Sequence, residues 1–116
     1  EIQQSPNSLS VSEGGQGRMS CLQKGTVRDS KLWYRQTEGA GLELIGSVYS
    51  SQESQYEKEF RSGYFISADA GNKFSLEIRS VRDRDEARYF CAAKERTGPS
   101  NSYEATFGNG TKVVVL

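Results

Sequence analysis

Asp85-Glu86-Ala87-Arg88-Tyr89-Phe90-Cys91 is the stretch of this sequence that decides the fold. Its cysteine lies 70 positions after Cys21, the only other cysteine, and Tyr89 precedes Cys91 by two positions. The only tryptophan, Trp33, follows Cys21 by 12 positions. Two cysteines, a tryptophan and a tyrosine in this order and at these distances form a pattern that is hard to reach by chance.

This spacing resembles that of a two-sheet immunoglobulin sandwich, in which one cysteine of each sheet points into the core and a tryptophan packs on the bridge. The resemblance implies a disulfide between Cys21 and Cys91. Closing a loop of about 70 residues stabilises a fold by roughly 4 kcal/mol in the chain-entropy model. The resemblance also implies that the Tyr89 hydroxyl hydrogen-bonds to backbone upstream. The alternative is a pair of free thiols in an unrelated protein.

Length and composition limit the number of domains, the kinds of partner and the cellular compartment that the chain can have. At 116 residues, we expect one domain, 1–116, with a single core. Because the formal net charge is zero, we expect neither nucleic acid nor a membrane surface as a partner of the domain. A disulfide indicates an oxidising compartment, so we expect a secreted or extracellular chain.

No apolar run approaches the roughly 20 residues of a membrane span, and Glu1 begins strand-like sequence without a signal peptide. We interpret the chain as a mature or recombinant fragment, with any membrane anchor lying outside it.

Alternating residues predict strands along the first third of the chain. The segment 2–11 reads as an edge strand interrupted at Pro6, because proline cannot donate to a strand ladder. In the segment 17–23, Met19 and Cys21 fall on one face, which we expect to point inward, and Ser20 and Leu22 fall on the other.

The strand predicted at 32–36 gives the sheet two different faces. If Trp33 points into the core, then Leu32, Tyr34 and Gln36 point the other way. With Leu42 and Leu44 beyond the next turn, this outer face is too apolar for water. We therefore expect it to meet another protein domain.

The middle of the chain predicts further strands at 44–49, 64–68 and 73–78. The turn residues 69–72 between the last two are typical of a hairpin. We expect three residues of the third strand to point inward, namely Phe74, Leu76 and Ile78. The segment 81–86 reads as a charged crossover.

Fifteen residues, 92–106, separate Cys91 from Phe107. Their charges, the Gly98-Pro99 breaker and the absence of core periodicity predict a long exposed loop. The following Phe107-Gly108-Asn109-Gly110-Thr111 opens a last strand, and its two glycines predict a bulge.

Nearly the whole chain resembles the variable domain of antigen receptors. The motifs that carry the resemblance are Trp33-Tyr34-Arg35-Gln36, the stretch 85–91, and Phe107-Gly108-Asn109-Gly110-Thr111, which looks like a joining segment. The resemblance implies an all-β fold, a V-type Greek-key β-sandwich of two sheets and about nine strands, with three hypervariable loops at one end.

Within that family, heavy chains usually have tryptophan at the position of Phe107, so the sequence is similar to a light chain or a T-cell receptor chain. The segments 34–36, 41–45 and 63–64 resemble a T-cell receptor beta chain most. The segments 92–93 and 3–6 are more similar to alpha or delta chains, so gamma-, delta- and alpha-like assignments stay open beside the beta-like one.

One position departs from the family pattern. Many members carry an arginine where this chain has Tyr64, and that arginine pairs with the aspartate at the position of Asp85. We therefore expect Asp85 to use Arg61, Arg82 or backbone amides instead.

The sequence gives no support to catalysis. Histidine is absent, both cysteines are assigned to a structural bridge, and no phosphate-binding glycine loop, metal-ligand cluster or cofactor motif is present. We interpret Asp83, Asp85 and Glu86 as solvated charges of a crossover turn. The domain is therefore not expected to be an enzyme.

The resemblance implies two binding surfaces. One is an antigen-binding end that carries rigid aromatic and adaptable polar side chains: Arg28, Asp29, Ser30, Tyr49, Ser50, Gln52, Lys94, Glu95, Arg96, Asn101 and Tyr103. The other is an interface with the variable domain of a second chain: Tyr34, Gln36, Leu42, Leu44, Phe90 and Phe107. The alternative for the second surface is that the third loop covers Phe90 and Phe107 and no partner is needed.

Asn109-Gly110-Thr111 also matches an N-glycosylation acceptor. Because it lies within the bulge motif, we interpret it as structural.

Together these features predict an extracellular antigen-recognition domain of a T-cell-receptor-like chain at the cell surface. Its expected antigen is a peptide or lipid on a presenting molecule, or an intact protein. The alternatives are an unpaired single-domain receptor, an antibody light-chain variable domain, and an invariant adhesion or co-receptor domain, which fold alone does not separate.

Overall fold

The computed structural model describes residues 1–24, 30–49, 52–69, 72–97 and 102–116, without the side chains of 95–97 and 102–103. These residues form eleven strands: β1 (Ile2–Ser5), β2 (Ser8–Val11), β3 (Gly17–Gln23), β4 (Ser30–Gln36), β5 (Glu43–Tyr49), β6 (Gln55–Tyr56), β7 (Tyr64–Ala68), β8 (Lys73–Ile78), β9 (Ala87–Thr97), β10 (Ser102–Phe107) and β11 (Thr111–Val115). Two short 3₁₀ helices accompany them, η1 (Lys58–Phe60) and η2 (Asp83–Asp85).

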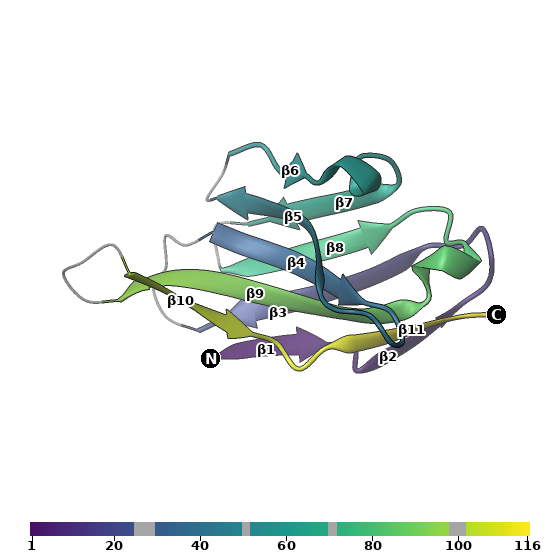
Figure 1. Ribbon diagram of the computed structural model, residues 1–116, viewed down its shortest axis with the longest axis horizontal. Helices are drawn as coiled ribbons and strands as arrows, with labels where there is room; N and C mark the ends of the chain where they lie inside the picture. The colour runs from purple at the N-terminus through teal and green to yellow at the C-terminus, as the bar shows by residue number, and fades with distance from the viewer. Residues whose placement is uncertain (25–29, 50–51, 70–71, 98–101) are drawn as a thin grey trace.

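The strands form two sheets that pack face to face (Figure 1). The first has the order β1-β3-β8-β7, and the second has the order β2-β11-β9-β4-β5-β6, with β10 also paired to β9. The eleven segments correspond to nine strands when β1 with β2, and β10 with β11, are each taken as one interrupted strand. This is the predicted V-type sandwich.

Pro6 marks the point where the first strand changes sheets. Before it, β1 pairs with β3 of the four-stranded sheet. After it, β2 pairs in parallel with β11 of the other sheet. The predicted interruption at Pro6 is confirmed, and one chain segment closes the same edge of both sheets.

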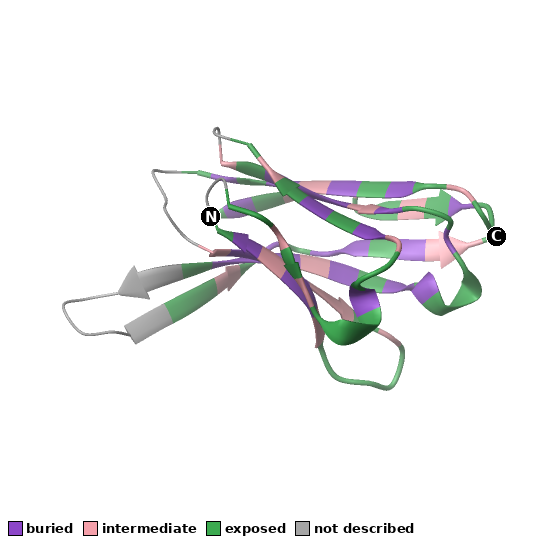
Figure 2. Ribbon diagram, turned by 90° about the horizontal axis from the view of Figure 1, so that it is seen from above, coloured by how far each residue is buried: buried purple, intermediate pink, exposed green. Residues whose placement is uncertain are grey.

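Burial alternates along the strands as the sequence pattern predicts (Figure 2). Met19 and Cys21 of β3 are buried in the core, whereas Leu22 points outward and is 40% exposed. The inward positions predicted on β8 are all buried in the same core cluster: Phe74, Leu76 and Ile78.

The inter-sheet bridge lies at the centre of this core. Cys21 of β3 and Cys91 of β9 form a disulfide with their Cα atoms 6.6 Å apart. Trp33 is fully buried, and its ring meets that of Phe74 edge to face at a centroid distance of 5.8 Å. The free-thiol alternative is therefore excluded.

Asp85 is buried, with 3% of its surface exposed, so its assignment to solvated charge is wrong. Its Oδ1 accepts a hydrogen bond from the Tyr64 hydroxyl, and its Oδ2 accepts one from the Arg82 backbone N–H at 2.8 Å. The expectation that Asp85 uses a backbone amide is therefore confirmed, and the amide is that of Arg82. No hydrogen bond or ion pair joins Asp85 to Arg61, which also lies among the described residues. Asp83 and Glu86 are exposed, as predicted.

Tyr64 takes the place of the family's arginine by donating a hydroxyl hydrogen instead of a guanidinium. The carboxylate keeps a charge-assisted hydrogen bond on each oxygen without a buried cation. The backbone carbonyl of the same aspartate accepts from the Tyr89 hydroxyl at 2.7 Å, which confirms the predicted tyrosine corner. Two tyrosines thus hold the turn η2 against the core.

Tyr64→Phe removes the hydroxyl that Asp85 accepts from and leaves a buried carboxylate oxygen without that donor. We expect the free energy of unfolding in urea to fall by about 1–3 kcal/mol. The matched control is Tyr34→Phe, because the Tyr34 hydroxyl has no hydrogen-bond partner among the described residues. Equal losses in the two variants would contradict the assignment.

Alkaline pH tests the same turn. Burial first, and then the hydrogen bond with Asp85, raises the pKa of Tyr64, and burial raises the pKa of Tyr89 to about 12. Because the folded state then holds protons that the unfolded state releases, this stabilisation is complete below the ordinary tyrosine pKa of 10.0 and is lost as pH rises through about 12. Urea unfolding at increasing pH should show this fall, and Tyr64→Phe should flatten it. A fall of the same size in the variant would oppose this account.

Candidate functional site

The segment predicted as a long exposed loop is mostly a hairpin. β9 continues to Thr97 and pairs with β10 in unbroken register from Phe107 opposite Ala92 to Ser102 opposite Thr97. Ala92 and Ala93 are fully buried. The loop prediction is therefore wrong for 92–97 and 102–106, because backbone pairing and two small buried side chains hold a segment that lacks an apolar pattern. Residues 98–101 lie outside the described residues.

The β9–β10 hairpin extends past the neighbouring strand. β4 pairs with β9 only as far as Ser30 opposite Lys94. Beyond that point, β10 is the only partner of β9 among the described residues, and the two strands form a ribbon that projects from the sheet (Figure 1).

Four of the residues assigned to antigen binding lie on described strands and turns at this end. Ser30 is the cross-strand neighbour of both Tyr49 and Lys94. Tyr49 is 42% exposed, Lys94 and Gln52 are exposed, and the Gln52 backbone N–H donates to the Tyr49 carbonyl at 3.0 Å. The fold thus brings together Ser30, Tyr49, Gln52 and Lys94.

The remaining assigned residues are less fully described. Arg28, Asp29, Ser50 and Asn101 lie outside the described residues. Glu95, Arg96 and Tyr103 belong to the hairpin, with Tyr103 opposite Arg96, and their side chains are not described.

The sequence analysis did not predict two buried polar side chains near this end of the core, Lys31 and Gln23. Lys31 is buried, and its Nζ lies 5.9 Å from the centroid of the Phe74 ring. Gln23, at the end of β3, is also buried. The available signal was alternation, since Lys31 precedes Trp33 by two positions and must share its inward face.

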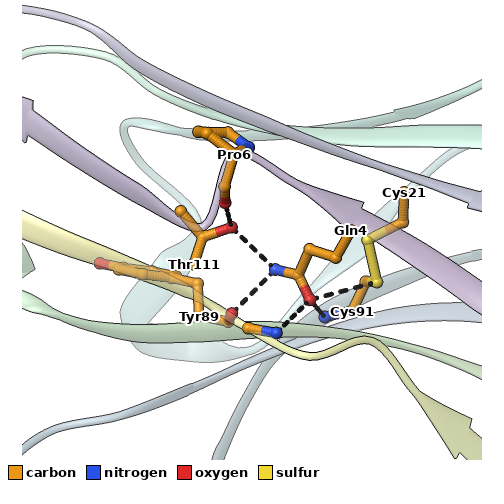
Figure 3. Close-up of a disulfide and its surroundings, with 7 residues drawn as sticks. Gln4, Pro6, Cys21, Tyr89, Cys91 and Thr111 are labelled. Atoms are coloured by element: carbon orange, nitrogen blue, oxygen red, sulfur yellow. Dashed lines mark hydrogen bonds between the residues drawn. A yellow bond between two sulfur atoms is a disulfide. The ribbon is translucent and has the colours of Figure 1, made fainter.

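Gln4 joins three strands around the disulfide (Figure 3). Its Nε2 donates to the Tyr89 carbonyl at 2.9 Å and to Thr111 Oγ1 at 3.1 Å, and its Oε1 accepts from the Gly110 N–H at 2.9 Å. The Thr111 hydroxyl in turn donates to the Pro6 carbonyl at 2.6 Å. The sequence analysis gave Gln4 no such role, although it shares the inward side of β1 with Ile2.

Gly110, which donates to Gln4, lies in the predicted bulge between β10 and β11. Three residues separate Phe107 from Thr111, whereas two separate their partners Ala92 and Tyr89 on β9. Gly110 has a φ of 100°, which favours glycine. The bulge is therefore confirmed.

Asn109 is exposed at the bulge, whereas Thr111 is fully buried. The structural interpretation of this acceptor motif stays a prediction.

The six residues assigned to a partner interface lie together on the outer face of β9, β4 and β5 or its border. Tyr34 is opposite Phe90 on one side and Leu44 on the other, and its ring centroid lies 5.6 Å from that of Phe107. Leu42 is 50% exposed and Phe107 is 43% exposed. Gln36 is exposed, and the other three are half-buried: Tyr34, Leu44 and Phe90.

Among the described residues, backbone of the bulge lies against Phe90. A Cβ placed on Gly110 would lie 2.8 Å from the Phe90 ring, so the ring rests on the glycine. Leu32 faces the same side and is buried opposite Ala92, outside the main core. The outer face is therefore apolar and largely uncovered at Leu42 and Phe107.

A two-sheet sandwich with this disulfide, a buried tryptophan and a tyrosine corner defines an immunoglobulin domain of variable type. The immunoglobulin V-set domain profile matches residues 4–116, and the chain belongs to this family.

Known relatives narrow the class to a T-cell-receptor-like variable domain. The mouse T-cell receptor beta chain V region LB2 is 33% identical over 116 residues, which cover 99% of this chain and 82% of that V region. The mouse alpha chain V region 2B4 is also 33% identical, over 98% of this chain and 82% of that region. Equal identity to beta and alpha chains agrees with the mixed features of the sequence.

A solved structure supports the same fold. One chain from the work titled "Structural basis of T cell specificity and activation by the bacterial superantigen toxic shock syndrome toxin-1" superposes with a TM-score of 0.90 at 25% identity, covering 100% of this chain and 98% of that chain.

The part of the chain that the structure describes contains no group of three metal-ligating side chains. Within the same residues, no helix is long and apolar enough to cross a membrane.

Gly108→Ala tests how tightly the bulge packs on the disulfide. A Cβ at this position would meet Gln4 Oε1 and lie 2.7 Å from Cys91 Sγ, so we expect a loss of about 1–3 kcal/mol in the free energy of unfolding. Gly41→Ala is the matched control, because a Cβ there meets nothing within 4 Å. A stable Gly108→Ala variant would show that the bulge can move away from Cys91.

Proposed function

We propose that this domain recognises antigen beside a second variable domain, with the outer face of β9, β4 and β5 as the pairing surface. The observation that carries the proposal is the exposure of Leu42 and Phe107 on a face that also holds Tyr34, Leu44 and Phe90. Clustered exposed apolar side chains favour a protein partner over water.

Gln36 gives this face a polar centre. Its Nε2 donates one hydrogen bond to the Ala40 carbonyl at 2.9 Å, which fixes the side-chain amide against the β4–β5 turn. The Oε1 and the second N–H are then free to bond an amide of the partner, and a glutamine would supply both complementary groups. A fixed amide at an apolar interface sets the register of pairing.

The antigen surface in this proposal is the end that carries Ser30, Tyr49, Gln52 and Lys94 together with the β9–β10 hairpin. Tyr49 supplies a rigid aromatic contact, and the other three supply adaptable polar contacts. We expect the antigen to be a peptide or lipid on a presenting molecule, or an intact protein, met by a receptor at the cell surface.

Leu42→Ser and Phe107→Ser test the pairing surface. Each should weaken association about tenfold or more if the side chain is a central anchor. The measurement is sedimentation equilibrium of the domain alone and with candidate alpha, beta, gamma and delta variable domains, which also identifies the chain class.

The matched controls are Leu22→Ser and Phe65→Ser, which remove side chains that are 40% and 39% exposed on the opposite sheet. These controls should pair as the unchanged domain does. A domain that stays monomeric with every candidate, even at high concentration, would overturn pairing and indicate a receptor domain that works alone.

A further inference from the structure

The start of β7, the end of β8 and η2 lie together at the end of the sandwich opposite the β9–β10 hairpin (Figure 1). Residues of these three segments line a small pocket. Its volume is about 180 Å³. Its polar lining consists mainly of two serines, three arginines and one carboxylate: Ser62, Ser80, Arg79, Arg82, Arg84 and Asp85.

The charge in this pocket is unbalanced. Three of the lining residues are arginines and only one, Asp85, has a carboxylate, which already accepts hydrogen bonds from the Tyr64 hydroxyl and the Arg82 backbone N–H. Because neither bond comes from a guanidinium, the arginine side chains of the pocket are not committed to Asp85.

The three arginines differ in what holds them. Arg79 is fixed by an ion pair with Glu77 at 2.7 Å and by stacking on Phe65, with 3.8 Å from its Cζ to the ring centroid. The Arg82 Nη1 lies 3.8 Å from the Glu13 Oε1, and such an exposed ion pair contributes little to stability. The guanidinium of Arg84 has no hydrogen bond or ion pair within the described part of the chain.

We propose that this pocket binds a tetrahedral oxyanion, a sulfate or phosphate group, with Arg84 and Arg82 as its principal cations. Guanidinium groups donate two parallel hydrogen bonds to such oxygens, and these charge-assisted bonds are stronger than neutral ones. Arg82 directly precedes η2 and Arg84 lies within it, so the two guanidinium groups can reach different oxygens of one anion. The hydroxyls of Ser62 and Ser80 supply further donors.

The anion can come from a free ion or from a sulfate ester on a sugar chain. A free ion has only the pocket to bind to, whereas a sugar chain gains contacts outside it. The two sources are therefore distinguished by comparing inorganic sulfate with a heparin-derived disaccharide.

The test is an amide NMR titration of the whole domain with sodium sulfate, and then with phosphate, at an ionic strength held constant with chloride. We expect saturable shifts at Ser62, Ser80 and Arg82. Arg84→Gln should weaken binding about tenfold, the usual effect of removing one charge-assisted hydrogen bond. Arg88→Gln, which removes an exposed arginine outside this pocket, should leave the affinity unchanged.

Arg84 is exposed, so its variant should fold as the unchanged domain does, and its amide spectrum reports this directly. Shifts that fail to saturate, shifts centred elsewhere, or equal binding by Arg84→Gln would overturn the proposal. With the site confirmed, tighter binding of the disaccharide identifies a sulfated sugar as the source, and equal binding identifies a free ion.

Discussion

The disulfide between Cys21 and Cys91, packed beside the buried Trp33, is the constraint on which the rest of this structure depends. It fixes β3 of one sheet against β9 of the other. In the second sheet, β9 pairs with three strands, β4, β10 and β11. Gln4 bonds to the Tyr89 carbonyl, two residues before Cys91, and to the Gly110 N–H, so the first strand and the bulge before β11 are tied to β9 beside the disulfide. The covalent bridge therefore sets the position of both sheet edges.

From this centre, one strand positions both proposed surfaces. Along β9, Tyr89 and Cys91 point into the core, while Phe90 points to the outer face. Farther along the same strand, Lys94 lies beside Ser30 at the antigen-binding end. A shift of β9 by one residue would exchange its buried and exposed faces, so its register governs pairing and antigen contact together.

The sequence predicted the central features because strand alternation and motif spacing record them directly, as at Trp33 and Cys91. It failed where distant partners decide the outcome. Asp85 is buried because Tyr64, 21 positions earlier, supplies a hydrogen bond. The pairing of 92–97 with 102–107 is held by backbone hydrogen bonds, which a polar sequence does not reveal. Gln4 was missed because its bonds reach backbone 85 and more positions away. The side chains assigned to antigen contact were reached only through family resemblance, whereas alternation and apolar character alone indicated a partner-binding face with Tyr34, Leu42 and Leu44.

The most direct test of pairing through the outer face is a methyl NMR spectrum of the leucine-labelled domain, recorded as an unlabelled partner variable domain is added. The account predicts shifts of Leu42 and Leu44, which lie on or border the outer face, while Leu22 on the opposite sheet and Leu76 in the core stay in place. Shifts of Leu22 with Leu42 and Leu44 unchanged would contradict it.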